Sequence, residues 1–275
     1  MELTEEQIQA LKQKQLEIFK AFITSCEQLG LKYYVLGGTM LGAVRHKGYI
    51  PWDDDIDIGM LRKDYDIFLK LGQSCLPEKY FLQTHVTDPE YPQNFAKIRD
   101  SSTTFVEKAM KNLTINHGVF IDIFPLDYYP DKHQICHEIM HLLQRLRISD
   151  AFTLEKPSLR ARFVRLFSRI LYPTIVSAVH AREKLMNNTQ HSSKIANYCG
   201  AWGRKEIVPC EWYGEGTMIT FEGMQVRLPT NYHGWLTQVY GNYMQFPPPE
   251  KRIPHHYVAS FDLQTSYIIK TKEKL

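Results

Sequence analysis

The first 29 residues carry the clearest periodic pattern of apolar and polar positions in the chain. Apolar side chains recur every three or four residues and predict one amphipathic helix over residues 4–29. Thr4 and Gln7 have the spacing of a capping box, and Gly30 ends the pattern. The predicted buried stripe of this helix consists of Ile8, Leu11, Ile18, Phe19, Phe22, Ile23 and Cys26.

Short apolar runs follow this helix and predict strands that alternate with helices. We expect strands at residues 33–36, 54–60, 80–85, 95–99, 103–107 and 118–127, and helices at residues 39–45 and 63–71. Residues 30–127 therefore predict a unit in which strands and helices are mixed.

Beyond Pro130 the pattern becomes mostly helical. Helices are predicted within residues 131–149, 158–190 and 232–240, a hairpin near residues 216–228, and an extended segment at Phe246-Pro-Pro-Pro249. We expect residues 1–127 to form the core of the protein. Residues 128–275 are expected to be a mostly helical region that completes the site within one compact unit.

Three aspartates stand next to isoleucines in two of the predicted strands. Asp55 and Asp57 alternate with isoleucines, and Asp122 has an isoleucine on either side. Because residues i and i+2 of a strand point to one face, we expect Asp55 and Asp57 to lie side by side. Carboxylates among buried apolar residues are costly unless a cation compensates them, and such sets hold divalent metals. The alternatives are an acidic surface loop, or pairing with Arg62 and Lys63.

A glycine pair stands just before the short helix predicted at residues 39–45. Gly37-Gly38-Thr39 follows an apolar run, and a glycine turn that opens a helix offers backbone N–H groups to a phosphate. Together with the aspartates, this turn predicts metal-dependent chemistry on a phosphate ester. Mg²⁺, or Mn²⁺, is the expected ion because it prefers carboxylates and phosphate oxygens.

Composition sets the outer limits of this interpretation. The chain has 275 residues, of which 44% are hydrophobic, and a net charge of +3, which does not indicate a nucleic-acid-binding protein. Its five cysteines include no CxxC pair, which favours a reducing compartment. The N-terminus is polar, and no run of about 18 apolar residues is present. We therefore expect a cytoplasmic protein.

Four segments of the chain resemble the LicD family of phosphotransferases. They are GGTMLGAVRHKGYIPWDDDIDIGMLRKDY, FAKIRDSSTTF, HGVFIDIFPLD and VYGNYMQFPPPEKRIPHH. The resemblance implies an α+β fold of the nucleotidyltransferase type, with a mixed sheet, flanking helices and a mostly helical C-terminal part. It also implies that Gly37 and Gly38 form the family's glycine turn. Asp55 and Asp57 match its paired metal carboxylates and Asp122 the third, as a metal ligand or as the base.

The resemblance further implies an activity and its partners. Family members move an alcohol phosphate, often phosphocholine, from a CDP-alcohol to a glycan such as teichoic acid or lipopolysaccharide. Related eukaryotic proteins handle ribitol phosphate. A lipid-linked glycan acceptor would bring the protein to the inner membrane surface. Another enzyme activity also stays open, namely nucleotidyl transfer to a small molecule.

Basic and aromatic residues near these segments are candidates for substrate contact. The predicted phosphate-binding residues are Gly37, Gly38, Thr39, Arg45, His46, Lys97, Arg99, Lys251 and Arg252. The alternative is a solvated basic loop for Arg45 and His46, and a structural ion pair for Arg99. A quaternary ammonium group would favour an aromatic cage, for which the candidates are Tyr49, Trp52, Tyr128 and Tyr129.

Two further motifs suggest other properties. Residues 137–141, His137-Glu138-Ile139-Met140-His141, match the HExxH pattern of zinc peptidases, but the extended motif with a third histidine fails at Arg147. A zinc metallopeptidase is therefore an alternative function. Residues 158–171, SLRARFVRLFSRIL, resemble a basic amphipathic helix that lies on anionic lipid. The alternative for this segment is a core-packed helix with an exposed basic edge.

Overall fold

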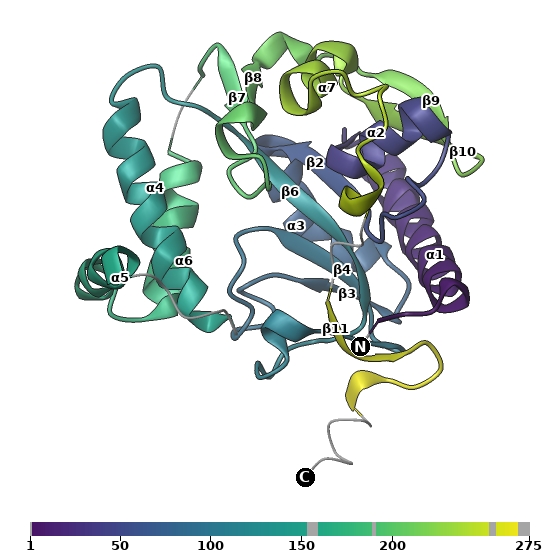
Figure 1. Cartoon of the computed structure of the whole chain (residues 1–275), viewed down its shortest axis with the longest axis horizontal. Helices are drawn as coiled ribbons and strands as arrows, with labels where there is room; N and C mark the ends of the chain where they lie inside the picture. The colour runs from purple at the N-terminus through teal and green to yellow at the C-terminus, as the bar shows by residue number, and fades with distance from the viewer. Residues whose placement is uncertain (1, 153–158, 189–190, 253–256, 269–275) are drawn as a thin grey trace.

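A mixed sheet organises the computed structural model (Figure 1). Its main path has the order β1 (Tyr34–Val35), β2 (Asp57–Leu61), β6 (Val119–Tyr128), β4 (Ala96–Asp100) and β3 (Tyr80–Gln83). β2 and β6 are parallel, whereas the other neighbours along this path are antiparallel. Two short strands, β7 (Lys194–Ala196) and β8 (Ile207–Pro209), continue the sheet from β6. The structure describes residues 2–152, 159–188, 191–252 and 257–268.

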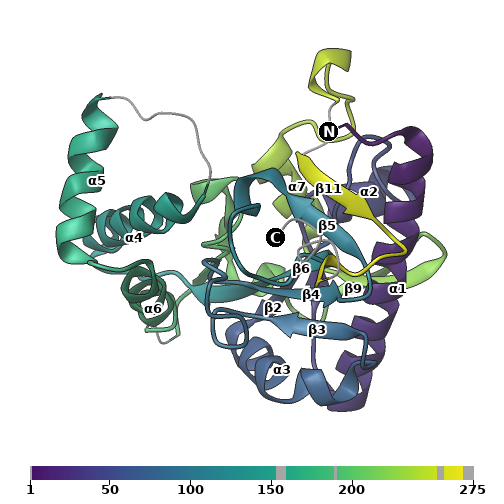
Figure 2. The ribbon, with the colours of Figure 1, turned by 90° about the horizontal axis from the view of Figure 1, so that it is seen from below.

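Two long helices pack on this sheet and on each other (Figure 2). They are α1 (Glu5–Leu29) and α3 (Arg62–Cys75), and α1 contacts β6 and β4 while α3 contacts β2, β3 and β6. Thr4 and Gln7 form the predicted capping box of α1, and Gly30 ends the helix in the left-handed conformation. The expected mixed sheet with flanking helices is confirmed, and the fold belongs to the α+β class.

The remaining elements lie in two groups beside the sheet (Figure 1). They are α2 (Gly37–His46), the hairpin of β9 (Thr217–Phe221) and β10 (Met224–Leu228), α7 (Tyr232–Tyr240), and the separate pair of β5 (Thr104–Glu107) with β11 (Val258–Asp262). Short 3₁₀ turns occur at Lys108–Met110, Ser149–Ala151, Gly203–Glu206, Cys210–Trp212 and Pro249–Lys251. Strands from the C-terminal half thus complete structure begun in the N-terminal half.

Three helices form a group to one side of the sheet, at the left of Figure 1. We call α4 (Gln134–Ile148), α5 (Leu159–Leu171) and α6 (Ile175–Met186) the helical lobe. This lobe has its own small apolar cluster, which consists of Leu143, Ile148, Tyr172, Ala178 and Val179. The main core is separate and draws on residues from Leu11 to Val258. The division of the chain at residue 127 stays a prediction.

Two element boundaries differ from the sequence-based expectation in a way that affects the site. The predicted strand 54–60 begins only at Asp57, because residues 53–56 form an irregular bend after a turn at Pro51-Trp52. The Asp53 N–H closes this turn by donating to the Ile50 carbonyl at 2.9 Å. The predicted helix 39–45 begins at Gly37, so the glycine pair forms its first turn. Among the described residues, no helix has the length and apolar character needed to cross a bilayer.

Candidate active site

Strand register places two of the predicted aspartates next to each other. Asp57 of β2 pairs with Asp122 of β6 in the parallel ladder, and Lys97 of β4 pairs with Asp122 in the antiparallel ladder. Directly paired residues point to the same face about 4.8 Å apart, so these three side chains form a row across the sheet. The Lys97 ammonium donates to Asp122 Oδ1 at 2.7 Å.

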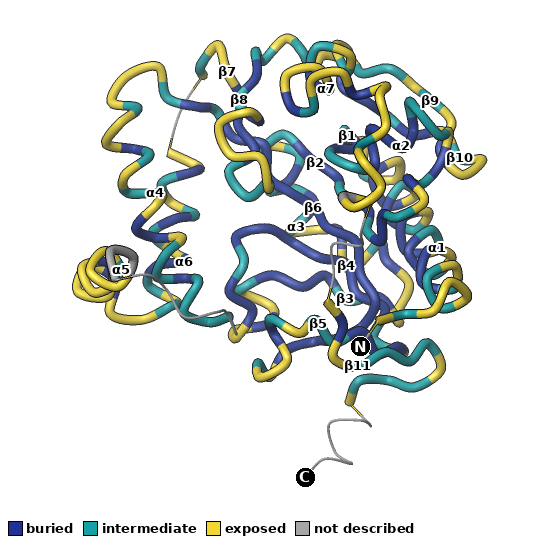
Figure 3. The backbone as a smooth tube through the Cα atoms, viewed as in Figure 1, coloured by how far each residue is buried: buried dark blue, intermediate teal, exposed yellow. Residues whose placement is uncertain are grey.

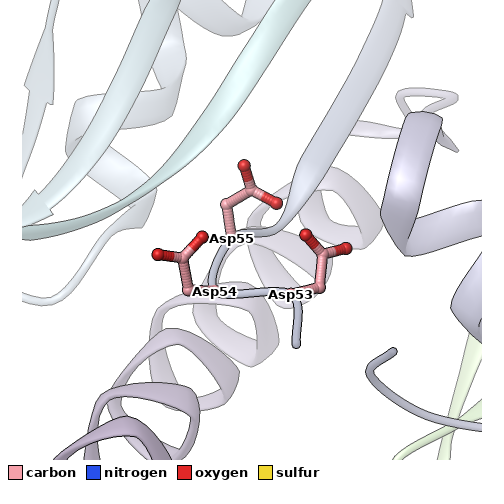
Figure 4. Close-up of side chains that lie close together, drawn as sticks. All are labelled: Asp53, Asp54 and Asp55. Atoms are coloured by element: carbon pink, nitrogen blue, oxygen red, sulfur yellow. The ribbon is translucent and has the colours of Figure 1, made fainter. Parts of the chain in front are cut away.

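Asp55 reaches this group from the bend before β2 and not from the strand. The expectation that Asp55 lies in the strand is therefore wrong, because β2 starts at Asp57, although the two carboxylates line the same cleft. Asp53, Asp54 and Asp55 are consecutive in the bend, and one carboxylate oxygen of each lies within 4.8 Å of the others (Figure 4). The bend thus adds Asp53 and Asp54, which the strand pattern did not assign, to an acidic cluster.

The N-terminus of α2 faces these carboxylates. A Cβ at Gly37 would lie 2.9 Å from Asp57 Oδ2, and a Cβ at Gly38 would collide with Asp53 Oδ2. Gly37 also has a φ of 51°, which disfavours any other residue. The glycine pair therefore allows the helix terminus to approach the aspartates closely. Thr39 is buried, and its hydroxyl accepts the Asp57 N–H at 2.9 Å, so it positions Asp57 and does not line the cleft.

These groups lie in a cleft of about 990 Å³ that both halves of the chain line. Its polar lining includes Asp53, Asp55, Asp57, Asp122, Glu206, Arg45, Arg145 and Arg182. Its aromatic lining includes Trp52, Phe95, Phe124, Phe152, Trp202, Tyr240, Tyr243 and Phe246. Trp52 is the one member of the predicted aromatic set among the described lining residues.

Negative charge is concentrated at the floor of this cleft. Burial, and then the charges of Asp55 and Asp122, raise the pKa of Asp57 well above its ordinary value. Such crowding of carboxylates favours a cation among them. The oxygen donors of Asp55, Asp57 and Asp122 are of the hard type that Mg²⁺ and Mn²⁺ prefer, so their chemistry fits the expected ion. Among the described residues, the acidic group that already has metal-binding spacing is Asp53, Asp54 and Asp55. Arg62 does not compensate the cluster, because it pairs with Asp127, Asp66 and Glu183.

Arg45 lines the cleft, whereas His46, which it contacts, is not among the described lining residues. Arg45 donates from Nη1 to the Tyr243 carbonyl at 2.8 Å and from Nε to His46 Nε2 at 2.9 Å. Its guanidinium stands 4.8 Å from the Phe246 ring centroid, and Arg252 stacks on Phe246 and Trp52. The two arginines thus hold the C-terminal rim against α2. The Lys251 side chain lies outside the described residues.

Lys97 and Arg99 are buried and do not line the cleft. The Arg99 guanidinium donates to Gln83 Oε1 at 2.6 Å, to the Gly118 carbonyl at 2.9 Å and to Glu107 at 3.1 Å. The prediction of a phosphate contact for Arg99 is corrected to the alternative, a structural ion pair, because internal acceptors take its donors. Lys97 reaches the site through its ion pair with Asp122.

Three charged residues of the cleft had no recognisable signal in the sequence. Arg145 of α4 and Arg182 of α6 come from the helical lobe, and Glu206 comes from a 3₁₀ turn. Within the described part of the chain, no hydrogen bond or ion pair engages the Arg145 guanidinium. Burial, and then the charge of Arg182, lower the pKa of Arg145. Burial raises the pKa of Glu206 to about 7. Only tertiary packing brings these residues to the cleft.

The HExxH residues form an aromatic cluster in the helical lobe. The rings of His137 and His141 lie 5.2 and 5.0 Å from the Tyr198 ring. The Glu138 carboxylate accepts the Tyr129 hydroxyl at 2.6 Å and pairs with Arg204 at 3.3 Å. The geometry therefore does not favour the peptidase alternative.

Comparison with known proteins places this geometry in context. Residues 30–166 match the family model described as LicD/FKTN/FKRP, nucleotidyltransferase domain. The chain is 32% identical to the lipopolysaccharide cholinephosphotransferase LicD of Haemophilus influenzae over 265 residues, which cover 92% of this chain and 95% of that protein. It is 33% identical over 147 residues to an uncharacterized protein of Rickettsia prowazekii, covering 51% of each. A 38-residue segment is 47% identical to the human ribitol 5-phosphate transferase FKRP, covering 14% of this chain and 8% of that protein.

Proposed function

The chain belongs to the LicD family, and from this premise we propose that it moves phosphocholine, or a similar alcohol phosphate, from a CDP-alcohol to a cell-surface glycan such as lipopolysaccharide or teichoic acid. Similarity to a lipopolysaccharide cholinephosphotransferase over nearly the whole chain supports the class of donor group and acceptor. The observation that carries the proposal is the meeting of Asp57 and Asp122 with the glycine N-terminus of α2 at the floor of one cleft.

The cleft offers complementary groups to a CDP-alcohol. The N-terminus of α2 at Gly37 and Gly38 presents backbone N–H groups and the positive end of the helix dipole to the diphosphate. Arg145 and Arg182 supply positive charge from the helical lobe. Asp55, Asp57 and Asp122 would hold Mg²⁺, or Mn²⁺, which when bound neutralises charge on the transferred phosphate.

The reaction is a displacement at the alcohol-bearing phosphorus. An acceptor hydroxyl forms the new oxygen–phosphorus bond, the bond to the CMP phosphate breaks, and CMP leaves with the electron pair. The hydroxyl proton passes to a carboxylate of the acidic cluster. Asp122 either completes the metal site or accepts this proton, and the ion pair with Lys97 fixes its position in both cases.

A panel of CDP-alcohols tests the proposal. We expect CMP release from CDP-choline, CDP-ribitol or CDP-glycerol in the presence of envelope glycan extracts, with the modified glycan identified by mass spectrometry. Asp55→Asn and Asp57→Asn should each lower turnover at least about a hundredfold, because each removes a carboxylate while keeping the side-chain shape.

The matched control is Asp64→Asn, which changes an aspartate of the first turn of α3 that does not line the cleft. Circular dichroism should show an unchanged fold in all three variants. Full activity in both the Asp55 and the Asp57 variant would overturn the assignment. Pyrophosphate release from ATP without CMP release from any CDP-alcohol would instead favour nucleotidyl transfer.

A further inference from the structure

The outermost helix of the lobe turns its apolar side toward solvent. In α5, five exposed apolar residues recur at helical spacing, namely Phe163, Leu166, Phe167, Ile170 and Leu171, with Phe163 at 76% and Ile170 at 68% exposure, and Val164 is exposed beside them. Figure 3 shows α5 largely in the colour of exposed residues, at the edge of the molecule. A helix of a globular domain normally buries such a stripe against the core. We call these five residues the apolar ridge.

The opposite side of α5 attaches it to the lobe through polar contacts. Ser168 is fully buried there, and Arg169 and Arg165 pair with Asp150 at 2.9 and 3.7 Å. Asp150 also pairs with Arg147 at 3.0 Å. The orientation of α5 is therefore defined by specific contacts, and the ridge faces outward as a consequence.

Exposure of the apolar ridge to water is unfavourable in free energy, and burial against a partner would remove this penalty. Each large apolar side chain left in water forgoes roughly 25 cal/mol per Å² of burial. Contiguous exposed apolar surface of this kind marks contact with a protein or a membrane. The neighbouring α4 adds three more exposed apolar residues, Ile135, Ile139 and Leu142. The sequence-based alternative of a core-packed helix with an exposed basic edge is thus wrong for α5.

The charges of α5 decide which partner fits. Its sequence LRARFVRLFSRIL holds four arginines and no acidic residue. Two of them, Arg165 and Arg169, share the single carboxylate of Asp150 with Arg147, so this contact keeps a net positive charge. Arg162 is exposed, and no described residue pairs with it. A second copy of the chain would bring arginines against arginines, whereas an anionic lipid surface complements them. With 13 residues, α5 is too short to span a bilayer, so it would lie in the plane of the interface.

We propose that α5 docks the protein on an anionic membrane surface, with the apolar ridge inserted among lipid chains and Arg162 at the headgroups. This docking does not depend on the proposed transfer reaction.

Co-sedimentation with vesicles tests the docking. We expect the full chain to bind vesicles of phosphatidylglycerol and phosphatidylcholine at low salt, and to bind phosphatidylcholine alone far less. Added salt should weaken binding because exposed charges are screened. The triple substitution Phe163→Gln, Phe167→Gln and Ile170→Gln should lower the partition coefficient about tenfold or more.

The matched control replaces three exposed apolar residues elsewhere, in Leu71→Gln, Val86→Gln and Met218→Gln, and should bind vesicles like the unchanged chain. Thermal unfolding verifies that both triple variants are folded. Light scattering of the unchanged chain tests the alternative that a second copy of the chain covers the apolar ridge. A dimer that the ridge substitutions dissociate, or an absence of vesicle binding at low salt, would overturn the proposal. CMP release measured in parallel without lipid reports on the transfer reaction independently.

Discussion

At the scale of single residues, buried carboxylates determine how the cleft responds to pH. Glu206 accepts hydrogen bonds from the Trp202 N–H and from Asn197 at 2.9 Å each, yet burial still raises its pKa to about 7. A carboxylic acid whose pKa is higher in the folded state binds its proton more tightly there than in the unfolded chain. Stability is therefore greatest below the unfolded pKa and falls as the pH rises toward about 7.

This shift predicts a measurable dependence of the unfolding free energy on pH. Between pH 5 and 8, the unchanged chain should lose about 2 kcal/mol more stability than Glu206→Gln, since glutamine has no proton to release. Urea unfolding at several pH values measures both slopes. The amide of the Glu206→Gln variant beside the Trp202 and Asn197 donors changes the free energy of unfolding by the same amount at every pH. Comparison of the two slopes therefore removes this effect. Equal slopes would show that Glu206 titrates at an ordinary pKa in the folded protein.

The sequence predicts some residues of the cleft and not others for a physical reason. The local pattern predicts the regular elements in or beside which Asp55, Asp57, Asp122 and the glycine pair lie. Arg145 instead reaches the cleft through the packing of the helical lobe, which no local spacing encodes. For Arg99 the sequence predicted a contact in the site that the structure does not show. This arginine lies in a segment that resembles the family, but it forms an internal ion pair.

At the scale of elements, one arginine connects three of them. Arg62 at the start of α3 donates to both oxygens of Asp127 on β6, at 2.6 and 2.8 Å. It also donates to Glu183 on α6 at 2.6 Å. The Asp127 side chain is almost fully buried, so this bidentate pair is its main compensation. The contact joins the helical lobe to the central sheet.

Removal of this arginine should therefore destabilise the whole fold. Arg62→Met leaves Asp127 buried without its partner and should lower the unfolding free energy by about 3–5 kcal/mol. Denaturant unfolding measures the loss. Asp66→Asn is the control, because Asp66 is an exposed partner of Arg62 at 3.3 Å, and its loss should cost under about 0.5 kcal/mol. Similar stability of the two variants would mean that Arg62 does not join these elements energetically.

Element prediction succeeded where a periodic signal was long. The helix over residues 4–29, the strand over 118–127 and the helix over 232–240 agree with α1, β6 and α7 within about one residue. β7, β8 and β11 were not predicted. β7 and β8 have three residues each, too few for an alternating pattern, and their pairing depends on distant partners.

At the scale of the whole molecule, two bodies of unequal size line the cleft, namely the part built around the main core and the helical lobe. The main core includes residues of both halves, whereas the helical lobe has its own small cluster. Polar contacts connect the lobe to the rest, among them Asn94, whose side chain donates to the Val179 carbonyl at 2.8 Å and accepts from Arg182 at 3.1 Å. Arg182 also donates to the Tyr198 carbonyl at 2.8 Å. A small core joined by polar contacts favours local opening of the lobe.

We therefore predict that amide hydrogens of α4 and α5 exchange at least about tenfold faster than those of α1 and β6. Because Arg145 and Arg182 line the cleft, a bound CDP-alcohol should slow exchange in α4 and α6. Hydrogen exchange with mass spectrometry measures both effects.

The β9–β10 hairpin, which does not line the cleft, is the internal reference. Arg145→Gln should reduce the ligand-induced protection of α4 without changing exchange in the free protein, since no described residue depends on that guanidinium. Unchanged exchange in the lobe on donor binding would mean that the donor occupies only the aspartate and glycine side of the cleft.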